Sequence, residues 1–134
     1  MNSQTSPTLQ AIYKEALGDY GGYKEFLWMH RGRFVHYVQR AIDAGLLEPT
    51  YSRKHFKLEK LSYSLDPSRD SLLNATEIAK LANYLLKDTS GKIVETPQYY
   101  WMRIAMTRSI NTENPTRSAL VLYDELSLKP EASS

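Results

Sequence analysis

The three histidines are the residues best suited to metal binding or proton transfer, because an imidazole can do either near neutral pH. His30 and His36 lie six residues apart in one predicted helix, whereas metal-binding pairs on a helix favour spacings of three or four. His55 falls in a basic stretch and is expected to be solvated. The pattern favours ordinary semi-buried or surface histidines and predicts no metal site.

Carboxylates and glycines add no catalytic pattern. Asp66 stands three residues before Arg69, a spacing typical of helix capping and surface ion pairing. Gly21 and Gly22 lack the spacing, and the following Lys-Ser/Thr pair, of a phosphate-binding loop. The chain contains no cysteine, which excludes disulfides, thiol catalysis, thiolate zinc sites and iron–sulfur ligation by its own residues. We therefore predict no self-contained catalytic, metal or cofactor site.

A basic aromatic stretch, MHRGRFVHYVQR at residues 29–40, could hold phosphate or single-stranded nucleic acid. On a helix, however, Arg31, Arg33 and Arg40 need not share one face with the aromatic residues. A net charge of +2 is also too small to indicate nucleic acid by itself. The stretch is better explained as an amphipathic helix with a solvated basic edge.

The elements that would position these residues are those of one small domain. A length of 134 residues suits a single domain, and 42% hydrophobic residues is normal for a globular protein. The sequence contains no run of 18 apolar residues, and its start, MNSQTSPTLQAIYK, lacks the features of a secretory signal. We therefore expect a cytoplasmic protein that spans no membrane.

Helix starts and stops are indicated by capping residues. Gly18 and Gly45 mark helix ends, and Gly32 weakens the middle of a long helical pattern. Thr96 before Pro97 predicts a helix start, because the hydroxyl can cap the helix and proline has no N–H to leave unpaired. Residues 50–65 are predicted to hold one helical turn and an extended piece. The predicted helices cover residues 8–18, 23–45, 66–88, 97–111 and 115–127.

Residues 85–95, LLKDTSGKIVE, interrupt this helical pattern. Turn-forming residues from Asp88 to Gly91 separate two short apolar runs. We therefore predict a mainly α, bundle-like domain with one small β-hairpin at about residues 85–95. The three adjacent aromatic residues 99–101 would need cover on more than one side of their helix, which predicts contact with another domain or chain as well.

Five short motifs follow one another in the later part of the chain: DPSRD at 66–70, YLLKD at 84–88, SGKIVETPQ at 90–98, YYWMRIAM at 99–106 and ALVLYDELS at 119–127. In this order and spacing they resemble the N-terminal all-helical domain of the large, catalytic subunit of ribonucleotide reductase. The resemblance covers residues 34–128. It makes residues 1–33 an N-terminal tail and helical lead-in, and residues 129–134 the start of a truncated substrate loop.

The resemblance implies an enzyme that reduces ribonucleotides to deoxyribonucleotides for DNA synthesis, by radical chemistry in a ten-stranded α/β barrel with downstream cysteines. This chain has no cysteine, so it would complete the enzyme in trans with a second chain that carries the barrel and the redox cysteines. It would bind no cofactor. A diiron or dimanganese small subunit, or adenosylcobalamin, would generate the radical. The matching residues expected to maintain the fold, not to catalyse, are Asp66, Arg69, Asp70, Thr96, Pro97 and Gln98.

In this family, the loop after the last helix binds the phosphate of the substrate nucleotide through a hydroxyl residue and backbone amides. The resemblance places the first residues of that loop at Ala132, Ser133 and Ser134. It therefore implies Ser134, or as the second choice Ser133, as the substrate-binding hydroxyl. The family's optional ATP-binding cone is larger than residues 1–33, so no allosteric activity site is expected here.

Two other functions stay open. A helical domain of this family could serve as a non-catalytic adaptor or regulatory protein that binds a reductase or another partner. A small nucleic-acid-binding module is the third hypothesis, and it would show salt-dependent binding to single strands. That module would use the basic residues Arg31, Arg33, Arg40, Arg53, Lys54 and Lys57.

Overall fold

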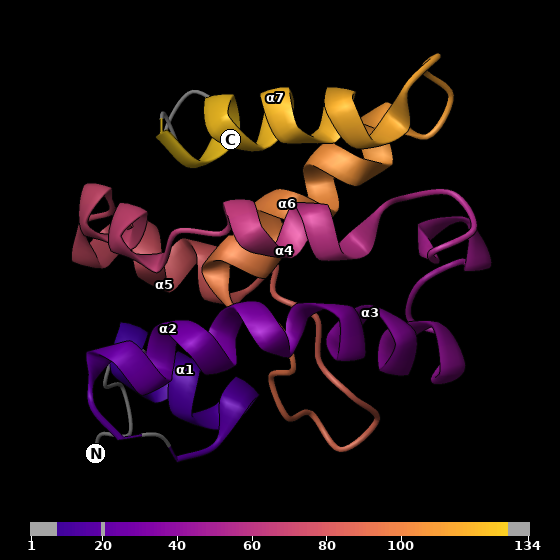
Figure 1. Cartoon of the computed structure of the whole chain (residues 1–134). Coiled ribbons are helices and arrows are strands. Elements are labelled where there is room, and N and C mark those ends of the chain that lie inside the picture. The colour runs from indigo at the N-terminus through magenta and orange to yellow at the C-terminus, as the bar shows by residue number, and fades with distance from the viewer. Residues whose placement is uncertain (1–7, 20, 129–134) are drawn as a thin grey trace.

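The computed structural model describes residues 8–19 and 21–128, and this part of the chain is mainly helical (Figure 1). None of the described helices is both long and apolar enough to cross a membrane. In chain order the elements are α1 (Leu9–Leu17), α2 (Tyr23–Gly32), α3 (Phe34–Asp43), the 3-10 helix η1 (Pro49–Tyr51), α4 (Leu58–Ser64), the 3-10 helix η2 (Pro67–Leu72), α5 (Ala75–Ala82), α6 (Pro97–Ser109) and α7 (Pro115–Leu128).

Glycines end or interrupt the N-terminal helices where the sequence predicted it. Gly18 follows α1 with a φ of 80°, and Gly45 follows α3 with a φ of 77°, a backbone region that only glycine adopts without strain. The long helix predicted over residues 23–45 is divided into α2 and α3. The division falls at Gly32 and Arg33, which confirms the weak point predicted there.

The segment after α3 is more helical than predicted. The extended piece expected within residues 50–65 is wrong, because α4 occupies Leu58–Ser64. Its apolar side chains at Leu58 and Leu61 are 2% and 0% exposed, so tertiary packing of one helix face stabilises α4 despite its weak sequence periodicity.

The single helix predicted over residues 66–88 is also wrong in its extent. Asp66 does cap a helix that begins with proline, but this helix is the short η2. Asn74 then starts α5 with a capping box, in which its side chain accepts the N–H of Glu77 at 2.8 Å and its own N–H donates to the Glu77 carboxylate at 2.8 Å. A side chain that caps a new helix ends the preceding one, and this separates η2 from α5.

The small β-hairpin predicted between α5 and α6 is wrong as a pair of strands. An isolated antiparallel bridge between Lys87 and Ile93 joins its two arms, and no strand occurs in the described residues. The arms bind side chains from the rest of the chain. The N–H of Leu86 donates to the carboxylate of Glu95 at 3.0 Å, and the N–H of Ile93 donates to the carboxylate of Glu15 at 2.5 Å. Two backbone hydrogen bonds flank the bridge, from Val94 to Leu86 and from Asp88 to Lys92, both at 2.9 Å. The N–H of Leu86 pairs with the Glu95 carboxylate and not with the facing arm, so the ladder does not extend.

Helix α6 lies in the middle of the fold, and α7 runs back across it (Figure 1). The side chains of Tyr99 and Trp101 on α6 are 1% and 6% exposed, so this chain covers them itself. The Tyr99 ring stacks on His30 with 4.7 Å between ring centres, and Phe34 meets it edge-on at 5.4 Å. Tyr100 is half-buried. The prediction that these aromatics need another domain or chain is therefore wrong for Tyr99 and Trp101.

Thr96 offers a test of how α6 is held. Its buried hydroxyl accepts the N–H of Tyr99 at 3.1 Å and lies 2.9 Å from Nε2 of His30. Thr96→Ala should lower the free energy of unfolding by about 2–3 kcal/mol, because it removes a helix cap and leaves a buried imidazole unpaired. Urea denaturation measures this loss. Thr8→Ala, at the exposed cap of α1, is the matched control and should lose about 1 kcal/mol or less; equal losses would contradict the role of the buried pair.

Candidate functional site at the end of the last helix

The last helix, α7, is held by a chain of buried polar side chains. Asp70 in η2 is 4% exposed. One of its carboxylate oxygens accepts the hydroxyl of Tyr13 in α1, and the other accepts Nε2 of Gln98 in α6 at 2.6 Å. The side-chain oxygen of Gln98 in turn accepts the hydroxyl of Tyr123 in α7. This network, the Asp70 network below, joins η2, α1, α6 and α7.

Tyr123 extends the Asp70 network to the start of η2. Its hydroxyl oxygen accepts the N–H of Asp66 at 3.0 Å while its proton goes to Gln98, so the hydroxyl acts as donor and acceptor at once. The carboxylate of Asp66 caps η2 by accepting the N–H of Ser68 at 3.0 Å. The residues that begin η2 therefore also fix the position of α7.

Arg69 binds the C-terminal half of α7. Its Nη1 donates to the carboxylate of Asp124 at 2.9 Å and to Oγ of Ser127 at 2.8 Å, and its guanidinium lies 5.2 Å from the ring centre of Tyr123. The ion pair contributes little by itself, because Asp124 is exposed. Ser127, however, is 1% exposed and also donates to the carbonyl of Tyr123. Together these bonds orient the end of α7 at Leu128.

The electrostatics of the Asp70 network suit a structural role. Burial raises the pKa of Asp70 to about 6, against the hydrogen bonds from Tyr13 and Gln98, which lower it. Burial also raises the pKa of Tyr123 to about 12 and that of Tyr13 well above its usual value. Both phenols therefore stay protonated donors at neutral pH. Each group is buried and engaged with another, so the network can hold helices but presents no free nucleophile.

A second network surrounds Glu95, just before α6. Its fully buried carboxylate accepts the hydroxyl of Tyr37, the N–H of Leu86 at 3.0 Å, and Nε and Nη2 of Arg103 at 2.6 and 3.0 Å. Burial lowers the pKa of Arg103, but the hydrogen bond and the charge of Glu95 outweigh burial and raise that pKa overall. This second network fastens α3 and the α5–α6 connection to α6.

The chain resembles known proteins over most of its length. Residues 73–129 match the family described as ribonucleotide reductase, all-alpha domain. This part of the chain therefore belongs to the ribonucleotide reductase all-alpha domain family. The chain is 31% identical over 119 residues to ribonucleoside-diphosphate reductase subunit alpha of Chlamydia muridarum, an alignment that covers 89% of this chain and 11% of that protein. It is 36% identical over 92 residues to the protein of the same name from Helicobacter pylori strain 26695, covering 68% of this chain and 12% of that protein.

The expected resemblance to the all-alpha domain of ribonucleotide reductase is thus confirmed. The matched residues include α5, α6 and α7, which carry Gln98 and Tyr123 of the Asp70 network. The chain spans about a tenth of the length of the reductase relatives named above. The domain boundaries expected at residues 33–34 and 128–129 stay predictions.

The residues that the resemblance implied for substrate binding by the reductase, Ser133 and Ser134, lie outside the described residues, as does the whole of 129–134. The structure describes helix α7, which precedes these residues in the chain and ends at Leu128. Sequence reasoning singled out Asp70 and Gln98 but missed their tyrosine partners. A signal existed for Tyr123, because a phenol on the apolar face of a helix needs a hydrogen-bond partner once it is buried.

The three histidines, which all precede the matched residues 73–129, do not come together. His30 is fully buried, more than predicted, and burial followed by the charge of Arg31 lowers its pKa to about 3, so it is neutral at pH 7. His36 is exposed, as is His55, whose Nε2 lies 2.7 Å from the carbonyl oxygen of Ile110. Across residues 8–19 and 21–128, no group of histidines and carboxylates could hold a metal ion.

The basic residues considered for nucleic-acid binding do not form one free surface. Arg31 donates to the carbonyl of Leu65 at 3.0 Å, and Arg33 donates to the carbonyl of Leu17. Arg53 forms an ion pair with a nearby glutamate. Cations that already bind within the chain have less to offer a phosphate backbone, so the geometry does not favour a nucleic-acid-binding module.

Asp70 should make the stability of the domain depend on pH. Its folded pKa of about 6 exceeds the usual 3.8, so the folded state binds this proton more tightly, and the stability due to Asp70 falls as pH rises from 3.8 to about 6. Asp70→Asn removes this loss. The unfolding free energy of the variant minus that of the wild type should therefore rise by up to about 3 kcal/mol across this window, as measured by urea denaturation.

The matched control for this pH series is Asp88→Asn. Hydrogen bonds from Ser90 and Lys92 lower the pKa of the half-buried Asp88, so its titration falls below the window. The unfolding free energy of Asp88→Asn minus that of the wild type should therefore stay nearly constant. His30 is present in all three proteins and cancels in the subtraction. A flat difference for Asp70→Asn would show that Asp70 is not the group that titrates.

Proposed function

We propose that this chain is the N-terminal helical part of a ribonucleotide reductase large subunit and that it completes, in trans, an enzyme reducing ribonucleotides to deoxyribonucleotides for DNA synthesis. The observation that carries the proposal is the match of residues 73–129 to the reductase all-alpha domain. The similarity to reductase alpha subunits along 89% of the chain supports it. Because the chain has no cysteine, the reductive thiols must come from residues outside these 134.

We assign those thiols to a second chain that carries the barrel and the redox cysteines of the large subunit. A radical-generating small subunit is a further partner of the complete enzyme, and this chain binds no cofactor in the proposed assembly. The all-alpha chain contributes binding geometry, since the buried carboxylate and phenols of the Asp70 network hold helices together.

The proposed contribution of this chain to substrate binding is a hydroxyl at Ser134, with Ser133 as the second choice. Helix α7 leads toward these residues, and the Asp70 network and Arg69 hold α7 in place. A catalytic contact misplaced by about 1 Å can cost around a hundredfold in rate. Buried hydrogen bonds restrict motion more than exposed ion pairs do, so this anchoring suits a helix that presents a substrate contact.

Co-expression tests the proposed function. The tagged full chain is co-expressed with a barrel-bearing reductase chain, and the purified complex is assayed for ribonucleotide reduction. Activity is expected from the complex and from neither chain alone. Ser134→Ala should lower kcat/KM about 10- to 100-fold, because it removes a hydrogen bond to a charged phosphate.

The control for this assay is Ser71→Ala, an exposed serine on η2, which should leave kcat/KM unchanged. Loss of activity in Ser133→Ala but not in Ser134→Ala would move the substrate contact to Ser133. A well-folded chain that captures no cysteine-bearing partner and restores no activity would overturn the enzymatic proposal and leave the adaptor function.

A further inference from the structure

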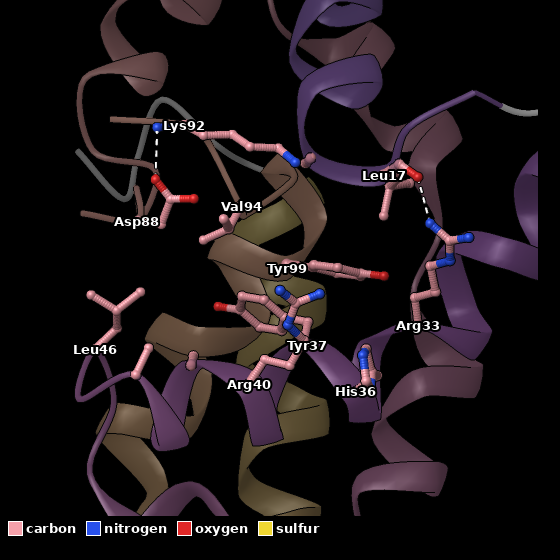
Figure 2. A pocket seen from close by; sticks show the side chains of 13 residues that line it. Leu17, Arg33, His36, Tyr37, Arg40, Leu46, Asp88, Lys92, Val94 and Tyr99 are labelled. Carbon is pink, nitrogen blue, oxygen red and sulfur yellow. Dashed lines mark hydrogen bonds between the residues drawn. The ribbon is translucent and has the colours of Figure 1, made fainter. Parts of the chain in front are cut away.

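A pocket opens between the end of α1, the outer face of α3 and the α5–α6 connection (Figure 2). Its volume of about 460 Å³ is in the range of sites for small molecules. None of its lining residues belongs to the Asp70 network, so the pocket is separate from the support of α7. Its apolar lining includes Ala16, Leu46 and Val94, with Tyr37 and Tyr99 beneath them.

Positive charge dominates the rim of this pocket. Arg33, Arg40 and Lys92 line it, and Asp88 is the one carboxylate among its lining residues. The Asp88 side chain already accepts the N–H of Ser90 at 2.9 Å, the hydroxyl of Ser90 at 2.6 Å and the N–H of Lys92 at 3.0 Å. The turn therefore uses this carboxylate internally, and the pocket keeps an excess of positive charge.

Two of the three cations are free to bind a ligand. Arg33 donates to the carbonyl of Leu17, which holds it at the rim (Figure 2). The guanidinium of Arg40 and the ammonium group of Lys92 form no hydrogen bond or ion pair with any described residue, although the charge of Lys92 helps to lower the pKa of Asp88. By contrast, Arg103 is paired with a buried carboxylate. An arginine left free at the edge of a hollow is suited to bind an anion, and above all a phosphate, through its planar fork of donors.

Below the accessible lining, the floor of the pocket consists of Tyr37 and Tyr99, which are 8% and 1% exposed and carry no charge. The ring centres of Tyr37 and Tyr99 are 4.8 Å apart. Both hydroxyls are engaged, that of Tyr37 with Glu95 and that of Tyr99 with the carbonyl of His30. Burial raises the pKa of both tyrosines above the usual value, so both remain neutral. A ligand that fits this site combines an anionic end with an apolar body.

We propose that this pocket binds a small phosphorylated molecule, with its phosphate between Arg40 and Lys92 and its apolar part against the half-buried side chains of Ala16, Leu46 and Val94. Lys92 adds a point charge to the bidentate donors of Arg40. Arg33 adds positive potential at the rim. The volume of about 460 Å³ suits a small molecule better than a protein segment. This proposal concerns the chain by itself, so its test does not depend on reductase activity.

Inorganic pyrophosphate and phenyl phosphate are the probes, added to the isotope-labelled full chain at low salt and followed by NMR and calorimetry. Saturable binding is expected with a Kd of about 1 mM or tighter. Chemical shift changes should cluster in residues 33–46 and 88–94. Inorganic phosphate is the reference ligand for phenyl phosphate, which should bind more tightly because its ring reaches the apolar lining.

The double variant Arg40→Gln/Lys92→Gln should weaken pyrophosphate binding at least about tenfold, because it removes two charge-assisted contacts. Lys24→Gln/Lys60→Gln removes the same net charge from exposed positions outside the pocket and should bind within about twofold of the wild type. Circular dichroism checks that both variants fold.

Three results would overturn the proposal. They are equal weakening in both double variants, absence of saturation by about 10 mM pyrophosphate, and shift changes that map to residues 53–57 and 113–117, which line a more open basic hollow elsewhere. Each would mean that Arg40 and Lys92 are ordinary solvated charges.

Discussion

A buried carboxylate must receive hydrogen bonds from the fold around it, and the arrangement of this domain follows from that constraint at Asp70. Its donors come from Tyr13, 57 residues earlier, and from Gln98, 28 residues later. The Gln98 amide has one orientation that donates to Asp70 and accepts from Tyr123. Each partner therefore fixes the next, and removal of any one leaves another unpaired in the core.

Glu95 imposes the same constraint on the opposite side of α6. It gathers Tyr37, Arg103 and the backbone of Leu86, whereas Gln98 faces η2 and α7. The start of α6 is thus positioned by polar pairing on two sides. Apolar burial along the rest of the helix supplies most of the stabilisation, since side chains such as Met102 and Ala105 are fully buried. Polar pairing here selects one arrangement among several that would bury similar area.

The sequence predicted features that depend on adjacent residues. Thr96 before Pro97 starts α6, and Gly18 and Gly45 follow helices with positive φ, because caps and turns act within a few residues. The predictions of a β-hairpin and of a single helix over 66–88 were wrong, because side chains from distant residues, or competing helix caps, determine the conformation of those segments. Glu95 accepts the N–H of Leu86, which a longer hairpin ladder would have paired with Val94.

The candidate site was predictable only in part and by resemblance. Family motifs pointed to Asp70 and Gln98 as fold residues and to Ser134 as a substrate contact, which remains a prediction. Spacing carries no information on a pair such as Tyr13 and Asp70, since their contact exists only once α1 and η2 are packed. The sequence also did not predict the free cations around the pocket. In the sequence, Arg40 is one of several basic residues on a helix, and only the structure shows which residues surround it.

The central place of α6 has a consequence for synthesis of the protein. Ribosomes add about 5–20 residues per second, so α1 to α3 emerge seconds before α6. Until then His30, Phe34 and Tyr37 lack Tyr99, the ring against which all three pack. The nascent N-terminal half therefore exposes an aromatic surface that only the later half can cover, and the chain depends on rapid folding or on chaperones during that interval.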